Sequence, residues 1–373
     1  MKRVVFLIDN LKGGGAEKAI KIIVEGLQEK GLDPIVILIE DQKDYALNDE
    51  IEIYALKNKI SQYNFLGLYF KLVKLLKKLN PDIVYATNTK AQILSLMTKP
   101  FFKTQRIINI QVDLTKQYEN RQYIFSFYNK LLKCADGYSF ISKGIYENLK
   151  DKIPEKQNMF IPNPIDFNEI DKLKVENLED EYKFIFEKKV FITIGRLTQQ
   201  KGQWDLLKAF SLLNDDAHLV ILGAGEKEKE LKELAREYNI DNKVFFLGFQ
   251  KNPFKFLYRA DIFVLSSLWE GFGNVIVEAM RCELPIISTD CPSGPREIIA
   301  PGSDVNYKLK SDIEVTEFGI LVPVADPLNL SRAMNKINET EQVKLNYKEK
   351  SIQRARAYSR EIIVDSIIRE LEL

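Results

Sequence analysis

Short apolar runs alternate with longer amphipathic stretches along nearly the whole chain. The clearest apolar runs predict buried strands at residues 4–8, 34–39, 82–87, 190–194, 218–222, 261–265 and 285–289. The amphipathic stretches predict helices at residues 16–30, 65–79, 204–213, 226–238 and 274–282. Continuously apolar strands alternating with helices are typical of parallel sheets that are covered on both faces. The sequence therefore predicts an α/β protein built from doubly wound, Rossmann-like sheets.

The alternation breaks once, after residue 160, where the chain becomes rich in proline and then acidic. Pro162 and Pro164 favour extended backbone in the residues that precede them. With 373 residues, the chain is long enough for two domains. We therefore expect an N-terminal domain over residues 1–163, a linker over 164–183 and a C-terminal domain over 184–357. The last segment, 358–373, is expected to be a helix that can cross back to the N-terminal domain.

Three glycine-containing loops follow predicted strands and are candidates for phosphate binding. Gly14 and Gly15 precede the first helix, where backbone amides and the helix dipole favour an anion. Gly195, with Arg196 and Lys201 behind it, could hold a diphosphate, since an Arg fork and a mobile Lys both pair with phosphate. Gly223 would form a wall of the same site. Tight turns and solvated surface cations are the alternative explanation, and neither the dinucleotide nor the P-loop glycine spacing is met.

The most specific pattern is EGFGNVIVEA, which follows the predicted strand at 261–265. Glu270 lies in the loop and Glu278 about one turn inside the next helix. Phe272 and Gly273 complete the loop, and the amides of Asn274 and Val275 begin the helix and can hold an anion. Two acids at this spacing can arise by chance, but the whole string after a buried strand is harder to explain in that way. The single histidine, His218, precedes a buried run and is expected to be structural.

This string, with GGGAEKA, GRLTQQKG, LVILGAGEKE, FLGF and DIFVLSS before it, resembles the retaining family-four glycosyltransferases of the GT-B fold. The resemblance covers nearly the whole chain and is more specific in its second half. It implies two Rossmann-like domains that face each other across a cleft, the N-terminal one on the acceptor side and the C-terminal one binding the nucleotide sugar. The co-substrate would be a nucleotide-diphosphate sugar, with no metal and no other cofactor. The string CPSGPREI at 291–298 is similar to that of enzymes that assemble bacterial surface glycans and protein-linked glycans.

The resemblance also implies a role for each candidate residue. Glu278 would bind the ribose, Glu270 would bind donor-sugar hydroxyls, and Arg196 and Lys201 would bind the diphosphate. Amides around Gly14, Gly15, Asn274 and Val275 would assist, and the base would lie near the loop 247–250, which contains Phe249. The departing phosphate oxygen would take the acceptor's proton as the sugar is transferred with retention. Many relatives have a histidine where this chain has Gln111, so that histidine's role cannot be transferred, and help from Asp113 is an open question.

Composition and charge restrict the location and partners of the protein. The chain contains three cysteines with no zinc or disulfide pattern, and no apolar run long enough for a signal sequence or a membrane span. We therefore expect a cytoplasmic protein with reduced thiols. Residues 1–160 contain 25 Lys and Arg against 18 Asp and Glu, and residues 55–110 contain ten basic residues and one acid.

The basic stretch includes a predicted amphipathic helix with Lys71, Lys74, Lys77 and Lys78. A solvated helix face is one explanation, and attraction to an anionic membrane surface is the other. The second would suit a lipid-linked or oligosaccharide acceptor and a peripheral location on the inner face of the cell membrane. We expect no nucleic-acid partner, because no binding motif accompanies the charge.

Three alternative functions remain to be weighed against sugar transfer. A nucleotide-sugar epimerase of the same fold would need acid and histidine groups, and the only histidine lies elsewhere. A silent scaffold subunit of this fold would be expected to lack one of the acids or cations, all of which are present. A nicotinamide dehydrogenase is disfavoured by the glycine spacing.

Overall fold

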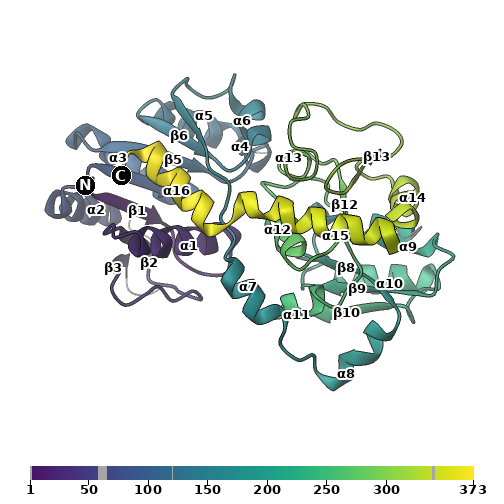
Figure 1. The fold of residues 1–373 in the computed structure, drawn as a ribbon. Helices are drawn as coiled ribbons and strands as arrows, with labels where there is room; N and C mark the ends of the chain where they lie inside the picture. Colours follow the sequence, from purple (N-terminus) through teal and green to yellow (C-terminus); the bar gives the residue numbers. More distant parts are fainter. Residues whose placement is uncertain (1, 58–64, 120, 338–340) are drawn as a thin grey trace. The chain divides into compact units, whose positions relative to one another are not determined.

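The computed structural model describes residues 2–57, 65–119, 121–337 and 341–373. The chain forms two compact units. Unit 1 comprises Met1–Ile165 and Tyr358–Leu373, and unit 2 comprises Asp166–Ala357. Each unit is a seven-stranded sheet with helices on both faces, shown as a ribbon in Figure 1. The predicted α/β fold class is therefore confirmed, with one Rossmann-like sheet in each unit.

The sheet of unit 1 is parallel throughout, and its strands follow the order β3-β2-β1-β4-β5-β6-β7. The central strand β1 pairs with β2 on one side and β4 on the other, so that Val5 lies between Ile35 and Val84. The seven strands are β1 (Val4–Ile8), β2 (Ile35–Glu40), β3 (Glu52–Lys57), β4 (Ile83–Thr87), β5 (Gln105–Ile110), β6 (Gly137–Phe140) and β7 (Gln157–Phe160).

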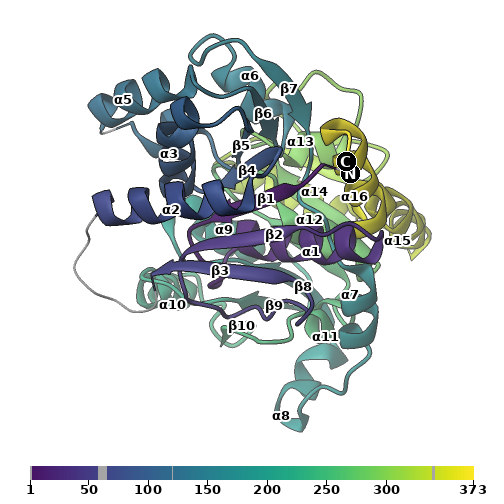
Figure 2. The same ribbon diagram turned by 90° about the vertical axis from the view of Figure 1, so that its left-hand side faces the viewer.

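Helices cover both faces of this sheet, as Figure 2 shows. On one face, α1 (Gly15–Glu29) packs against the C-terminal helix α16 (Arg360–Leu371). Ile20, Val24, Ile363 and Ile367 belong to one buried cluster with residues of β1 and β2. The opposite face carries α2 (Phe65–Leu79), α3 (Thr89–Thr98) and α5 (Gln122–Leu132), with α4 (Leu114–Gln117), α6 (Lys143–Leu149) and the 3-10 turn η1 (Lys99–Phe101) nearby in the chain.

The sheet of unit 2 has the order β10-β9-β8-β11-β12-β14-β13, and only β13 is antiparallel to its neighbour. The strands are β8 (Lys189–Ile194), β9 (Ala217–Leu222), β10 (Val244–Gly248), β11 (Ile262–Leu265), β12 (Ile286–Thr289), β13 (Glu314–Val315) and β14 (Ile320–Val322). The main helices are α9 (Gln203–Ser211), α10 (Glu228–Glu237), α12 (Asn274–Arg281), α13 (Pro295–Ile299), α14 (Pro327–Ile337) and α15 (Glu341–Ala355).

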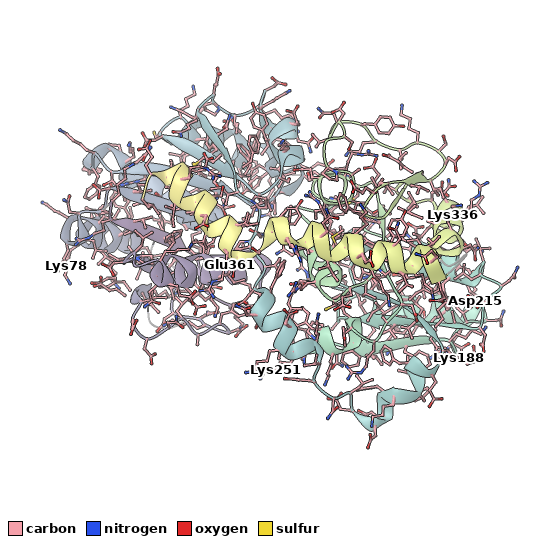
Figure 3. The ribbon with its side chains drawn as sticks, in the orientation of Figure 1. Lys78, Lys188, Asp215, Lys251, Lys336 and Glu361 are labelled. Atoms are coloured by element: carbon pink, nitrogen blue, oxygen red, sulfur yellow. The ribbon has the colours of Figure 1, made fainter. Side chains whose placement is uncertain are left out.

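At the amino-terminal edge of the unit 2 sheet, ion pairs join neighbouring chain segments at the surface. Lys188 pairs with Asp216 at 2.8 Å and Lys189 with Asp215 at 2.5 Å. Figure 3 labels Lys188 and Asp215 at this edge. Exposed pairs of this kind contribute little to stability. The residues that carry candidate chemistry lie at the other, carboxyl edge.

The residues expected to be a linker, 164–183, contain the helices α7 (Phe167–Lys174) and α8 (Asp180–Lys183). Helix α7 packs on α12, where the Arg281 guanidinium bonds the Asp171 carboxylate. Residues 358–373 belong to unit 1, because the Ile165 amide bonds the Tyr358 carbonyl at 2.9 Å and Lys30 pairs with Asp365 at 2.8 Å. The chain therefore passes from unit 1 to unit 2 after Ile165 and returns near Tyr358.

The contact between α1 and α16 leads to a prediction about Gly26. A Cβ atom at Gly26 would lie 2.5 Å from Cγ2 of Val364, so a larger side chain must push the two helices apart. We expect Gly26→Leu to cost about 2 kcal/mol, and Val364→Ala to recover part of that loss in the double variant. Thermal unfolding of the wild type and three variants measures this coupling. Additive changes in melting temperature would contradict close packing at this point.

Candidate active site

Most of the predicted donor-binding residues lie in unit 2, where the sheet brings four loops together. They follow β8, β9, β11 and β12, and β9, β8, β11 and β12 are consecutive parallel neighbours in the sheet. Parallel strands end at the same edge, so the loops that follow them converge there. The loops contain, in chain order, Gly195 to Lys201, Gly223, Glu270 to Val275, and the turn at residues 291–294.

Lys201 and Glu270 form an ion pair at the centre of this edge. The Lys201 Nζ lies 2.6 Å from Glu270 Oε1, and their side chains are 15% and 8% exposed. Ser267 donates its hydroxyl hydrogen bond to the same carboxylate oxygen, at 2.6 Å. The Lys201 stem lies against Gly195, where a Cβ would be 3.2 Å from Lys201 Cδ. Two residues that the sequence assigned to different parts of a donor are thus direct partners in the structure.

Two glycines allow the loops at this edge to approach one another closely. Gly223 has φ +133°, and a Cβ there would lie 2.0 Å from the Gly195 carbonyl oxygen. Gly294 has φ +76°, and its Cβ would lie 1.9 Å from the Phe272 carbonyl oxygen. Any larger residue at either position would displace backbone. Gly223 therefore lies against the Gly195 loop, and the turn at 291–294 supports the loop that carries Glu270.

The first turn of α12 presents a partly exposed face to this edge. Asn274, Val275 and Glu278 are half-buried, whereas Ile276 and Val277 are buried in the core. Positions 274, 275 and 278 share a face because side chains three or four residues apart are neighbours on a helix. Gly273, at φ +91°, turns the chain into the helix, while Phe272 is buried. Glu278 can therefore reach a ligand that lies against the amino-terminal end of α12.

Arg196 and Phe249 lie at the surface of unit 2. Arg196 is exposed, and no hydrogen bond or ion pair is seen for its guanidinium within the described part of the chain. Phe249 is 81% exposed and directly follows β10, where the Gly223 amide bonds the Gly248 carbonyl at 2.8 Å. Both side chains are accessible to a ligand.

Gly14 and Gly15 lie in unit 1 at the start of α1, whereas the other candidate donor residues belong to unit 2. A Cβ on Gly14 would meet Glu17 Oε2 at 1.9 Å, so the Glu17 carboxylate lies directly against this glycine. Asn88 donates a hydrogen bond to Glu17 Oε1 at 2.9 Å. A carboxylate is the side chain that a helix N-terminus favours. The Glu17 carboxylate therefore occupies the space beside Gly14 into which a side chain would extend.

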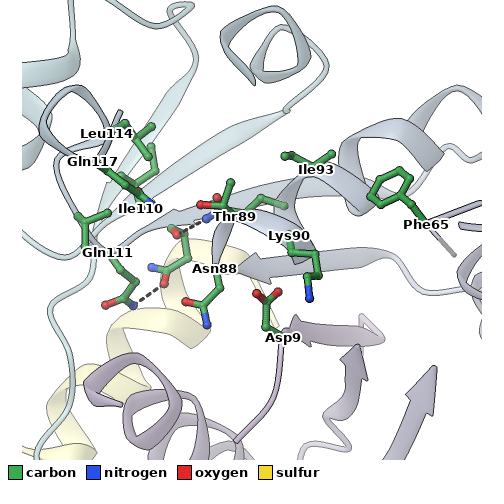
Figure 4. A pocket seen from close by; sticks show the side chains of 13 residues that line it. Asp9, Phe65, Asn88, Thr89, Lys90, Ile93, Ile110, Gln111, Leu114 and Gln117 are labelled. Carbon is green, nitrogen blue, oxygen red and sulfur yellow. Dashed lines mark hydrogen bonds between the residues drawn. The ribbon is translucent and has the colours of Figure 1, made fainter. Parts of the chain in front are cut away.

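Unit 1 also contains a cavity of about 500 Å³ at the carboxyl edge of its own sheet. Figure 4 shows Asp9 from the end of β1, Asn88 from the end of β4 and Lys90 from α3 extending toward the same space. Gln111, after β5, and Phe65, on α2, also line it. Of these residues, the sequence analysis singled out only Gln111. The available signal was the position of polar residues immediately after buried strands.

Gln111, at the position where the resemblance implied a histidine, is hydrogen-bonded to other side-chain amides. Its Nε2 donates to Asn109 Oδ1 at 2.5 Å and to Asn163 Oδ1 at 3.2 Å. Asp113 lies outside the cavity lining and accepts hydrogen bonds from the Thr115 amide and from Asn148. Asp113 is therefore the cap of α4. Among the described residues that line the cavity, the titratable groups are Asp9 and Lys90.

A buried ion pair beside the donor edge was not anticipated from the sequence. Asp290, directly after β12, is 0% exposed at its side chain and accepts two hydrogen bonds from Arg296, which is 3% exposed. Asp290 also accepts the Leu309 amide at 2.8 Å, and Arg296 bonds Glu314 at 2.8 Å. The pair thus ties the turn at 291–294 to the segment before β13. Arg296 lies in CPSGPREI, so the acid and the arginine were visible in the sequence, but their pairing was not.

Glycine loops, a cation and a helix N-terminus at the carboxyl edge of a doubly wound sheet define a nucleotide-binding α/β protein. Comparisons with known proteins identify the family. The family model described as Glycosyl transferases group 1 matches residues 175–357, and that described as Glycosyltransferase Family 4 matches residues 13–169. The chain belongs to the family-four glycosyltransferases of the GT-B fold.

Two curated relatives illustrate the similarity. A protein of Campylobacter jejuni subsp. jejuni is 30% identical over 96% of each chain; it is named N-acetylgalactosamine-N,N'-diacetylbacillosaminyl-diphospho-undecaprenol 4-alpha-N-acetylgalactosaminyltransferase. An uncharacterized glycosyltransferase of Methanocaldococcus jannaschii is 36% identical over 66% of this chain and 65% of that one, so the match spans slightly less than two thirds of its length.

Among solved structures, HepE of Anabaena in complex with UDP has a TM-score of 0.80, with 20% identity and 99% of both chains covered. HepE in complex with UDP-glucose has a TM-score of 0.79. At this level of identity the likeness concerns the fold.

The buried pair at Asp290 leads to a stability prediction. Arg296→Met would leave a fully buried carboxylate without its main partner, and we expect a loss of about 3–5 kcal/mol in the free energy of unfolding. The double variant Asp290→Asn with Arg296→Met should lose less, because no buried charge remains. Urea unfolding measures both, with Arg332→Met as the matched control, since Arg332 pairs with Asp312 at an exposed site. Equal losses for Arg296→Met and Arg332→Met would contradict this reading.

Proposed function

We propose that this protein is a retaining glycosyltransferase that transfers a hexose or an N-acetylhexosamine from a nucleotide-diphosphate sugar, UDP-linked, to a hydroxyl of a saccharide acceptor. The observation that carries the proposal is the Lys201–Glu270 pair beside the half-buried face of Asn274, Val275 and Glu278. The UDP and UDP-glucose complexes of HepE support the choice of nucleotide. The Campylobacter relative, whose name specifies a diphospho-undecaprenol acceptor, supports a lipid-diphosphate-linked saccharide in bacterial glycan assembly.

In this mechanism, charge stabilisation comes from the chain itself. Breaking the bond between the sugar and the diphosphate places more negative charge on the leaving phosphate, so fixed cations and helix-end amides favour the transition state. Lys201 is held in place by Glu270, and the exposed Arg196 is available as a second cation. The acceptor hydroxyl attacks the face from which the diphosphate leaves, and its proton passes to the departing phosphate oxygen. The proposal requires no metal ion.

The roles of the two glutamates within the proposal are separable. Glu278 would accept hydrogen bonds from the ribose hydroxyls throughout the reaction. Glu270, which forms an ion pair with Lys201, would accept a hydrogen bond from a donor-sugar hydroxyl. It would also keep the Lys201 ammonium oriented toward the leaving phosphate. Contacts that persist through the reaction mainly affect binding, whereas contacts that strengthen in the transition state mainly affect turnover.

We predict that Glu278→Gln weakens UDP binding about 10-fold, while Glu270→Gln lowers kcat about 100-fold with a smaller effect on UDP affinity. Calorimetric titration with UDP and turnover of UDP-sugars measure the two effects. Glu228→Gln, at a partly exposed position of α10 where Glu228 pairs with Lys232, is the control for a lost surface charge. Equal effects of the two site changes on UDP affinity would count against these roles.

Activity should survive EDTA, and loss on chelation that Mn²⁺ reverses would overturn metal independence.

We also propose that the protein works on the cytoplasmic face of the membrane, bound peripherally through α2. No helix in the described ranges is long and apolar enough to span a membrane. Leu66, Phe70, Lys74 and Lys77 are all exposed and lie at spacings of three or four residues, so they form one face of α2. Its amino-terminal half is apolar, with Leu66 64% and Phe70 65% exposed, and its carboxyl-terminal half is basic. Apolar and basic side chains together suit an anionic lipid surface.

The other two lysines of α2 contact unit 1 itself. Lys71 donates a hydrogen bond to the Leu56 carbonyl at 3.0 Å, and the Lys78 ammonium lies 5.5 Å from the centre of the Tyr54 ring. Lys78 is labelled near the surface of unit 1 in Figure 3. Lys59, one of the ten basic residues between 55 and 110, lies outside the described residues. Lys74 and Lys77 are therefore the lysines of α2 most available to a lipid surface.

We expect the double variant Lys74→Gln with Lys77→Gln to reduce co-sedimentation with anionic vesicles several-fold at 0.1 M salt, where attraction extends about 10 Å, and to leave UDP affinity unchanged. The matched control is Lys227→Gln with Lys232→Gln on unit 2, which removes the same charge elsewhere. If the wild-type protein remains in the supernatant with anionic vesicles at low salt, the peripheral-membrane proposal fails.

A further inference from the structure

Asp9 is a carboxylate at the cavity of unit 1 to which the donor chemistry gives no role. It lies directly after β1, and its Oδ1 accepts a hydrogen bond from the Ala91 amide, in the first turn of α3, at 3.0 Å. No hydrogen bond is seen for Oδ2 within the described part of the chain. Figure 4 shows the carboxylate directed into the space between Asn88 and Lys90. One oxygen of Asp9 therefore anchors the start of α3, and the other is available to the cavity.

Three charged groups act on Asp9 from the elements packed around it. Lys90, on α3, favours the ionised carboxylate, whereas Glu40, at the end of β2, and Glu17, on α1, oppose it. Lys90 also pairs with Glu40 at 2.9 Å, so its positive charge is divided between Glu40 and Asp9. Burial outweighs the favourable contacts and raises the pKa of Asp9 to about 6. Asp9 is therefore ionised at neutral pH. Its surroundings replace few of the hydrogen bonds that water would give it, and such a carboxylate is a strong hydrogen-bond acceptor.

The walls of the cavity combine two kinds of surface. Asn88, Lys90 and Gln111 supply amide and ammonium groups, while Phe65, Ile93 and Leu114 supply apolar side chains. A sugar ring has the complementary character, since its hydroxyls lie around the rim and its C–H groups lie on the faces. The volume, about 500 Å³, is within the usual range for a small-molecule site.

We infer that this cavity binds a pyranose ring of the acceptor, and that Asp9 Oδ2 accepts a hydrogen bond from one of its hydroxyls. The inference rests on the proposed function, because it specifies the acceptor side of the same transfer. The competing explanation is structural, in which Asp9 only caps α3. Asp9→Asn separates the two, because the amide oxygen of asparagine can still accept the Ala91 hydrogen bond, whereas the charge that strengthens a hydroxyl contact is lost.

The test uses the full chain and the methyl α-glycosides of glucose, galactose, N-acetylglucosamine and N-acetylgalactosamine, with binding followed by saturation-transfer NMR. We expect at least one glycoside to bind the wild type, and Asp9→Asn to weaken that binding about 10-fold. The matched control is Asp82→Asn, because Asp82 also accepts a backbone amide, that of Arg3, at the opposite edge of the same sheet. UDP affinity, measured in parallel, should be the same for all three proteins.

The pH dependence gives a second readout that a purely structural role would not produce. Wild-type affinity for the glycoside should fall as the pH is lowered through about 6, where Asp9 becomes protonated, and Asp9→Asn should show no such fall. Glu40→Gln removes a negative charge near Asp9 and leaves Lys90 without this partner. Both changes favour the ionised Asp9, so the fall should move to lower pH.

Asp9→Asn should raise the stability of the protein while it weakens glycoside binding. The pKa of Asp9 is raised in the folded protein, so protonated Asp9 is compatible with the fold and ionised Asp9 destabilises it. The free energy of unfolding is therefore higher in acid, and this advantage is lost as the pH rises through about 6. Asp9→Asn should therefore melt at a higher temperature than the wild type at pH 7.5, and the difference should shrink toward pH 4. A lower melting temperature at pH 7.5 would assign Asp9 to structure and overturn the inference.

Two further outcomes separate this inference from the proposed function. If UDP binds but none of the glycosides does, or if Asp9→Asn binds them as the wild type does, the acceptor assignment is overturned and the donor proposal is untouched. If UDP itself fails to bind the wild type, the proposed function falls and the inference falls with it.

Discussion

The parallel alignment of strands is the constraint on which both units depend. A parallel strand needs a crossover before the next one, so the parallel strands of each sheet end at one edge, and the loops that begin the crossovers gather there. In unit 2 this edge brings Lys201, after β8, to Glu270, after β11, although 69 residues separate them in the chain. In unit 1 the same constraint places Asp9, Asn88 and Gln111 around one cavity. Each cluster of polar groups follows from strand order.

Charge balance is the second constraint at these edges. Where a helix begins or a cation is partly buried, the structure supplies an acid: Glu17 lies at the start of α1, Glu270 pairs with Lys201, and Asp290 pairs with Arg296. The two ion pairs differ in exposure and so in what they can do. Asp290 and Arg296 are buried and join loops, whereas Lys201 keeps partial access to solvent. A partly accessible cation held by a carboxylate can exchange that contact for a ligand, and a fully buried pair cannot do so without cost.

The ionised form of Asp9 lowers the stability of the fold, and a ligand contact would explain why a carboxylate lies there. Its raised pKa means that its ionised form is less favoured in the folded protein than in the unfolded chain. The hydrogen bond to Ala91 recovers only part of that loss. Titratable groups with raised pKa values in cavities are candidates for ligand contacts, because a ligand's hydrogen bond can supply what water no longer supplies.

The sequence alone determined the fold class and the positions of half of the described strands and of several helices, and it marked EGFGNVIVEA as the most specific motif. These features depend on local periodicity and on residues that are adjacent in the chain. The predicted strand at 4–8 matches β1, and the predicted helix at 65–79 matches α2. Pairings between distant residues were decided only by the tertiary structure. Lys201 with Glu270, Asp290 with Arg296, and the cavity at Asp9 depend on strand order and on which oxygen faces which donor. The helical character of residues 167–174 was also decided there, because α7 gains its stability by packing on α11 (Phe254–Leu257) and α12 rather than from its own polar sequence.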